Sequence, residues 1–110
     1  MEQTNIEDVK EFSTDKRIRK KLLGSEKIVA EFVCYEPGQG TPEHVHPKQD
    51  EIFYCVEGKG IMIVDGEEIP MKPTSLILLK AREKHVVKTL PDSRFVMMFT
   101  KAPASTKSAS

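Results

Sequence analysis

The chain has few cysteines and no excess of charge of either sign. Its 110 residues include only two cysteines, Cys34 and Cys55. Two cysteines are too few for a disulfide framework and lack zinc-finger spacing, so we expect small apolar residues in a reducing compartment, with a single bridge as the alternative. Seventeen basic residues balance seventeen acidic ones. This balance excludes a global basic field for nucleic acid, so function must reside in a local site.

Long apolar runs are missing too. No segment approaches the ~20 apolar residues of a membrane span, and the N-terminal MEQTNIEDVKEF is acidic, unlike a signal peptide. We therefore expect a cytoplasmic protein with no membrane partner. No apolar stripe of helical period is present either. Short aliphatic and β-branched runs separated by turn residues instead fill residues 17–100, which predicts an all-β chain.

The organisation expected from this pattern is a single domain. We predict a lead-in over residues 1–15 with a short helix in IEDVKEF, a β-barrel over residues 16–101 and a polar flexible tail over residues 102–110. About seven strands predict a sandwich or barrel, and a jelly-roll barrel is favoured because it manages its own edges. Asp65 and Gly66, between two apolar runs, predict a tight hairpin.

The stretch GQGTPEHVHPKQDEIFYCVEG, residues 38–58, holds the candidate metal ligands. In a strand, residues i and i+2 share a face, so His44 and His46 can meet one ion. After the turn-rich PKQD, we expect a strand from Glu51 to return antiparallel beside the first and bring a carboxylate to the same ion. His85, which opens a later run, can complete the set. Three imidazoles and a carboxylate suit one Fe, Mn, Ni, Cu or Zn ion with an open position.

The same stretch resembles the first motif of the cupin superfamily, G-x5-H-x-H-x4-E-x6-G. The five positions are Gly38, His44, His46, Glu51 and Gly58. The second motif, G-x5-P-x-G-x2-H-x3-N, keeps only His85. Its other positions are held by Thr74, Lys80, Arg82 and Thr89. These departures put the shape of the turn before His85 in doubt, because proline and glycine supply φ angles that lysine and arginine do not.

The resemblance covers about residues 15–100 and implies a double-stranded β-helix, commonly a homodimer, with one divalent metal ion. The ligands it implies are His44, His46, Glu51 and His85. The alternative is a barrel that has lost its metal and uses these side chains in a hydrogen-bond network.

Strand parity extends the candidate site beyond the ligands. If Glu51 points inward, Phe53 and Cys55 share its face, and Val87 shares the face of His85. We therefore name Phe53, Cys55 and Val87 as candidate pocket lining, although ordinary core packing is the favoured interpretation of each. In RFVMMFT, parity does not choose between the odd-numbered and even-numbered residues of 95–99 for the inside.

Two basic segments have competing interpretations. KRIRKK, residues 16–21, is best explained as a strand with its polar face in water, because no aromatic residue punctuates it to stack on bases. KAREK, residues 80–84, lies near the strand end that delivers His85. A solvated loop is favoured there over a patch that attracts an anionic substrate.

The resemblance implies either of two functions. One is a metal-dependent oxygenase, isomerase or lyase that acts on a small oxygenated metabolite. The other is a non-catalytic, metal-dependent module that binds or senses a small molecule. An inward-facing proton-transfer group beside the metal would favour the enzyme. Tyr54 is predicted to face away, whereas the phase of the strand that carries Tyr35 is not set by the sequence.

Overall fold

The computed structural model describes residues 1–104, so residues 105–110 of the predicted tail lie outside the described residues. Nine strands and one helical turn make up this part of the chain. The elements are α1 (Ile6–Val9), β1 (Ile18–Gly24), β2 (Val29–Tyr35), β3 (Gly40–His44), β4 (Asp50–Gly58), β5 (Gly60–Val64), β6 (Glu67–Met71), β7 (Leu76–Leu79), β8 (His85–Thr89) and β9 (Phe95–Ala102). Among residues 1–104, no helix has the length and apolarity to cross a bilayer.

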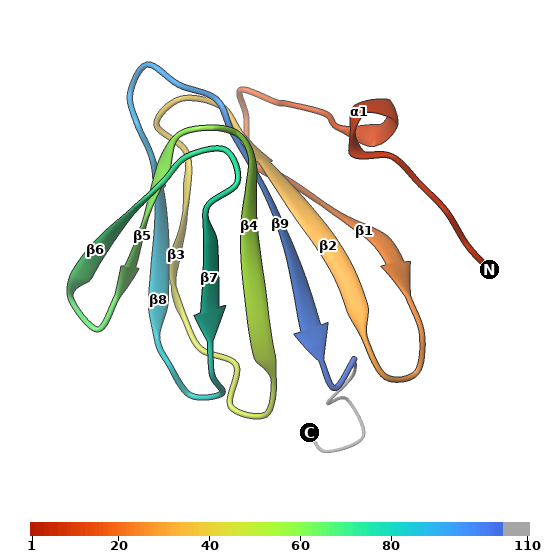
Figure 1. Cartoon of the computed structure of the whole chain (residues 1–110). Coiled ribbons are helices and arrows are strands. Elements are labelled where there is room, and N and C mark those ends of the chain that lie inside the picture. The colour runs from red at the N-terminus through yellow and green to blue at the C-terminus, as the bar shows by residue number, and fades with distance from the viewer. Residues whose placement is uncertain (105–110) are drawn as a thin grey trace.

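The strands form two antiparallel sheets that face each other (Figure 1). One sheet has the order β1-β2-β9-β4-β7 and the other the order β3-β8-β5-β6. Strands distant in sequence are therefore neighbours, as in a jelly roll. The predicted all-β jelly-roll barrel is confirmed.

The hairpin between β5 and β6 turns where the sequence predicted. Asp65 and Gly66 have φ angles of 50° and 83°. Both central residues of a primed two-residue turn need positive φ, and an aspartate followed by glycine tolerates this better than most pairs. The predicted turn is confirmed.

The expected pairing of the two motif strands is wrong. β4 does not return beside β3, because β3 pairs with β8 in one sheet while β4 pairs with β7 and β9 in the other. The loop between them carries the chain across the barrel. Sequence distance favours a hairpin, but pairing inside the jelly roll joins β3 to a strand about 40 residues later. Glu51 therefore faces the histidines from the opposite sheet.

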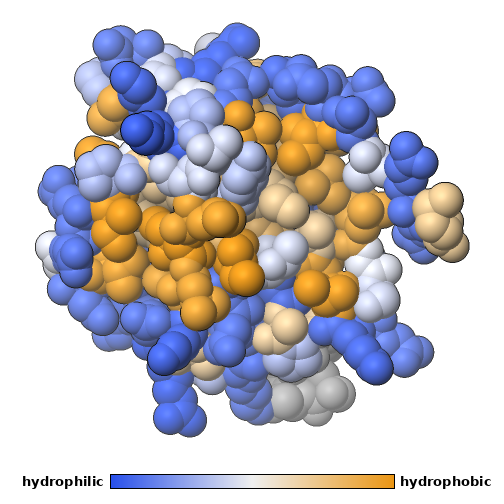
Figure 2. Space-filling view, viewed as in Figure 1, coloured by the Kyte–Doolittle hydropathy of each residue, from blue (hydrophilic) through white to orange (hydrophobic). Residues whose placement is uncertain are grey.

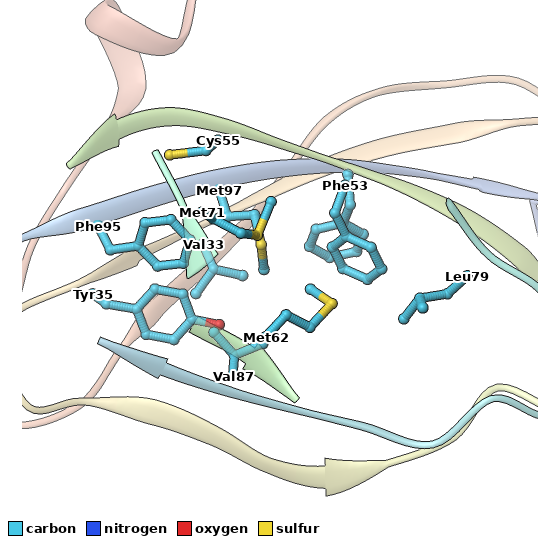
Figure 3. Packing of buried hydrophobic residues seen from close by; sticks show 11 residues of the cluster. Val33, Tyr35, Phe53, Cys55, Met62, Met71, Leu79, Val87, Phe95 and Met97 are labelled. Atoms are coloured by element: carbon cyan, nitrogen blue, oxygen red, sulfur yellow. The ribbon is translucent and has the colours of Figure 1, made fainter. Parts of the chain in front are cut away.

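The main core lies between the sheets (Figure 3). β9 presents Phe95, Met97 and Phe99 to this core, each at most 5% exposed. Val96 is also fully buried, but in a second cluster on the outer face of the same sheet. Partly buried residues of the lead-in, among them Val9, cover that cluster. Both faces of β9 are therefore buried and apolar. For this reason the alternation of residues along the strand does not tell which face points into the barrel.

Candidate metal centre

The three histidines meet at one end of the barrel. β3 ends at His44, β8 begins at His85, and the two residues are opposite each other in register. Their ring centroids are 4.0 Å apart. His46 lies in the loop just after β3, with its ring centroid 5.2 Å from that of His44 and 6.3 Å from that of His85. The predicted grouping of the histidines is therefore present, although His46 is beyond the end of the strand.

Glu51 approaches this cluster from the facing sheet. It is 3% exposed, and its Oε1 lies 3.6 Å from Nε2 of His46. All four side chains line one cavity of about 40 Å³. A volume of this size holds about three water molecules. The cavity thus brings together the four residues that the resemblance named.

One nitrogen in the cavity has no partner within residues 1–104. Nε2 of His85 is buried and makes no hydrogen bond. Nδ1 of His85 lies 3.4 Å from the carbonyl oxygen of Glu83, and Nδ1 of His44 lies 3.1 Å from that of Pro42. A ring nitrogen facing a carbonyl must carry the proton, which leaves the Nε2 lone pair for another partner. A buried polar atom with no partner costs about 1–3 kcal/mol, and a bound ion would remove that cost.

Burial sets the charge states of the cluster. Burial lowers the pKa of His46 and of His85 to about 4, and it raises the pKa of Glu51 to about 7 although Lys101 opposes that rise. At neutral pH the imidazoles are therefore neutral, which is the form that coordinates a metal. Glu51 titrates near neutrality, so a cation nearby would favour its ionised form.

The donor set fits a divalent transition metal in type and number. Its geometry in this structure is not that of a formed site: among residues 1–104, no three histidine, cysteine, aspartate or glutamate side chains converge at metal-binding spacing. His46 lies in a loop, with its Nε2 3.6 Å from Oε1 of Glu51. His44 and His85 are held in register by their strands.

The three predicted lining residues have different places. Phe53 and Val87 line the cavity, and the ring centroid of Phe53 lies 5.4 Å from that of His85. Cys55 lies in the core toward Phe95, away from Phe53 (Figure 3), and does not line the cavity. Its thiol faces the Gly58 carbonyl oxygen at 3.4 Å, and burial raises its pKa to about 11. Cys55 is therefore a packed, protonated thiol.

Tyr35 is a cavity residue that the sequence pattern does not reveal. Its side chain lines the cavity from β2, with the ring stacked on Phe95 at a centroid distance of 5.7 Å. Its hydroxyl lies 2.7 Å from the Thr41 hydroxyl. Burial raises the pKa of Tyr35, so the phenol keeps its proton. Both faces of β2 are apolar, so its alternation gave no signal for which face looks inward.

Arg17 and Arg19 also line the cavity, which sequence analysis did not expect of the KRIRKK segment. The basic residues of KAREK, in contrast, are exposed and do not line it. The side of KRIRKK that was interpreted as a solvated strand face is thus partly a wall of the site.

The backbone is glycine-like at both glycine positions of the second motif, although neither residue is glycine. Thr74 and Arg82 stand at the two glycine positions of the second motif and have φ angles of 76° and 77°. The Arg82 amide donates to the His46 carbonyl at 2.9 Å. The Ala81 amide donates to Oδ1 of Asp50 at 2.8 Å. These two bonds hold the turn at Arg82 and tie it to the segment that carries His46. Thr74 lies in a separate turn, between β6 and β7, where its amide donates to the Cys55 carbonyl at 2.9 Å.

Comparison with known proteins places the fold and the family. Over 78 residues the chain is 36% identical to an L-ectoine synthase of Aliivibrio fischeri, covering 69% of this chain and 61% of that protein. It is 30% identical over 71 residues to the polyketide synthase CurC of Streptomyces cyaneus, covering 64% of this chain and 46% of that protein. The chain therefore spans less than two thirds of the length of these curated relatives.

Among solved structures, the protein TT1209 of Thermus thermophilus superimposes with a TM-score of 0.88 at 24% identity, covering 96% of this chain and all of that one. Likeness at this identity shows a shared fold. The family model described as the cupin domain matches residues 31–100, which contain both motif segments and every candidate ligand. The chain belongs to the cupin family.

Proposed function

We propose that the chain binds one divalent transition metal ion through His44, His46, Glu51 and His85 and acts on a small oxygenated metabolite. The observation that carries this proposal is the unpartnered, buried Nε2 of His85 in a cavity shared with the other three side chains. A metal in such a site supplies a Lewis acid that polarises a substrate oxygen. Fe, Mn, Ni, Cu and Zn all suit the donors.

An enzyme is favoured over a binding or sensing module because of Tyr35. Its hydroxyl lies in the same cavity as the histidines and is paired with Thr41, and its raised pKa keeps the phenol protonated, so that it can donate a hydrogen bond to a bound oxygen. Phe53 and Val87 add apolar walls that limit water around a bound ligand. A synthase and a polyketide-pathway protein among the relatives make different products, so we propose oxygenase, isomerase or lyase chemistry without choosing one.

Elemental analysis of the protein purified without added metal tests the metal proposal. We expect about one transition metal ion per chain in the wild type and a loss of most of it in His85→Ala. Lys84→Ala is the matched control, because Lys84 is the exposed neighbour of His85 and lines no part of the cavity. A wild type that is metal-free and takes up none of the five metals would refute the proposal.

The metal-free chain should remain folded, because the apolar core supplies most of the buried surface and bound metal adds stability by mass action. Circular dichroism should give β-rich spectra with and without a chelator, and metal should raise the melting temperature. An unfolded metal-free form would instead indicate a structural ion, and it would count against an open catalytic position.

We also propose that the protein acts as a cytoplasmic homodimer. Ile52 of β4 and Leu76 and Leu78 of β7 are 48%, 65% and 56% exposed on the outer face of the five-stranded sheet. Figure 2 shows hydrophobic side chains gathered over the face where β4 and β7 run in Figure 1. Sedimentation should give a dimer that Leu78→Asp dissociates and that Lys88→Asp, an exposed change on the other sheet, leaves intact. A monomeric wild type would refute the dimer.

A further inference from the structure

The cavity has a cationic wall opposite its histidines. Arg17 and Arg19 both line it, from the start of β1. The residue between them, Ile18, packs in the cluster on the outer face of the sheet. Because neighbours in an extended chain point to opposite sides, this packing of Ile18 agrees with two arginine side chains turned toward the cavity.

The two guanidinium groups keep hydrogen-bond donors for a ligand. Arg19 donates from Nε to Oε1 of Glu31 at 2.6 Å, and its Cζ lies 5.5 Å from the centroid of the Phe99 ring. That bond uses one of five N–H groups. Arg17 donates from Nη1 to the Gly40 carbonyl at 3.3 Å, which joins the edge of one sheet to the edge of the other. Within residues 1–104 no carboxylate forms an ion pair with Arg17.

The charge around these arginines is not balanced. Lys101 is 8% exposed, pairs with Glu31 at 3.2 Å and stands opposite Glu51 in register. Burial raises the pKa of Glu31, but the hydrogen bond from Arg19 and the charge of Lys101 outweigh burial and hold its pKa below the usual value. Arg19 and Lys101 therefore share the ionised Glu31, while Arg17 has no carboxylate partner in the described part of the chain. Even with Glu51 ionised, these three cations outnumber the two carboxylates. Such a surplus attracts an anion and gives a neutral ligand no advantage.

The lining of the cavity favours one kind of anion. Apolar side chains including Val33, Phe53 and Met97 form much of the wall. An organic acid can place its carbon atoms against these side chains, whereas phosphate presents oxygens on every side. Arginine forks are suited to paired contacts with a carboxylate.

We propose that Arg17 and Arg19 bind the carboxylate of a small organic acid whose oxygenated carbon lies toward the histidine cluster. This assignment rests on the proposed function, because it names the substrate class of the same site. Arg17 supplies most of the preference for a carboxylate over a neutral ligand, because Arg19 already forms an ion pair with Glu31.

Titration of glycolate and of its neutral amide, glycolamide, into metal-free protein tests the proposal, since chelation by a metal cannot contribute there. Chemical shifts in NMR spectra report binding. Glycolate should bind at least about tenfold more tightly than glycolamide. Arg17→Gln should lower the affinity for glycolate about tenfold and leave the affinity for glycolamide unchanged. Arg17→Lys keeps the positive charge but not the paired N–H groups of the guanidinium, so it should lower the affinity for glycolate by less. Lys16→Gln is the matched control, one residue away and outside the cavity lining.

The outcomes separate this proposal from the metal proposal. Arg17→Gln should retain the metal content of the wild type, and His85→Ala should lose metal yet keep the preference for glycolate. If the wild type holds no metal but prefers glycolate, the anion site stands and the metal site fails. Equal binding of glycolate and glycolamide, or an equal loss in Lys16→Gln, would overturn the anion site. Tighter binding of inorganic phosphate than of glycolate would overturn the carboxylate assignment.

Discussion

The two motif segments of this cupin reach the same site by different means. Residues 38–58 keep every position of the first motif, and both of its terminal glycines have positive φ. Residues 74–89 have lost the glycines and the proline of the second motif. The backbone at Thr74 and Arg82 nevertheless has the φ that glycine would adopt. Backbone shape is thus retained where residue type is not. At Arg82, amides of the turn donate to Asp50 and to the His46 carbonyl, and the Thr74 amide donates to the Cys55 carbonyl.

The contrast shows two ways of making a turn near a binding site. A glycine adopts positive φ without strain, but it has no side chain to make contacts. A threonine or arginine in the same conformation is strained by roughly 1–3 kcal/mol, and surrounding bonds must hold it there. The second segment therefore stores strain next to His85, whereas the first does not.

The largest expected effect is the loss of Gly58, which ends the first motif. Gly58 has a φ of 75°, and a Cβ added there would collide with the carbonyl oxygen of Arg94. Gly58→Ala should lower the free energy of unfolding by about 3 kcal/mol or more, because backbone must move to make room. Urea denaturation measures the change.

Gly38→Ala is the matched control for that substitution. Gly38 has a φ of 85° but no atom within 4 Å of an added Cβ. Gly38→Ala should lower the free energy of unfolding by only about 1 kcal/mol, because alanine is strained in the left-handed conformation but meets no other atom. Equal losses in the two variants would contradict the role assigned to the close approach at Gly58.

The next effect is a pH dependence in which Glu51 and the histidines act in opposite directions. In metal-free protein the raised pKa of Glu51, about 7 against 4.5, gives stability that is lost as pH rises through 7. The lowered pKa of His85, about 4 against 6.5, gives stability that is lost as pH falls from 6.5 toward 4. The two windows overlap between about pH 4.5 and 6.5, so thermal denaturation of the wild type between pH 4.5 and 8 gives their difference. Single variants separate the two contributions.

Glu51→Gln should remove the loss of stability that Glu51 causes as pH rises from 4.5 to 7. His85→Phe should flatten the acidic limb, which is the loss that the histidines cause as pH falls from 6.5 to 4. His46 has the same lowered pKa as His85, so a remnant of the acidic limb should persist in His85→Phe. An unchanged profile in Glu51→Gln would refute the buried, partly protonated state of that carboxyl.

The smallest effect is a gain in stability in the second segment. Thr74→Gly should raise the free energy of unfolding by about 1 kcal/mol, because a β-branched residue at a φ of 76° is strained and glycine is not. Arg82→Gly should raise the free energy of unfolding by less, because arginine is not β-branched and is less strained at this φ. In both variants the added entropy of glycine in the unfolded chain reduces the gain. Chemical denaturation of the two variants checks the order, and a loss of stability in Thr74→Gly would show that the turn is not strained.

Much of the fold was predictable because it depends on local patterns. Strand runs, the turn at Asp65 and Gly66 and the all-β class all follow from alternation and turn chemistry over a few residues. The four candidate ligands were identified by spacing together with the family resemblance. Their meeting in one cavity agrees with that identification.

Other features depend on contacts between distant segments and were not predictable. Strand parity says which residues share a face, but not which face looks inward. For β2 and β9 both faces are apolar, and the lead-in around α1 covers the outer one. Tyr35 was therefore missed as a cavity residue, and Phe95 could not be oriented.

The sequence alone thus determines the strand periodicity and the type and order of the candidate ligands, since these are properties of neighbouring residues. Tertiary structure decides that Glu51 faces the histidines from the opposite sheet and that Arg17 and Arg19, not the lysines of KAREK, line the cavity. The physical reason is that pairing in a jelly roll joins strands far apart along the chain. The side chains that such pairing brings together carry no common signal in the sequence.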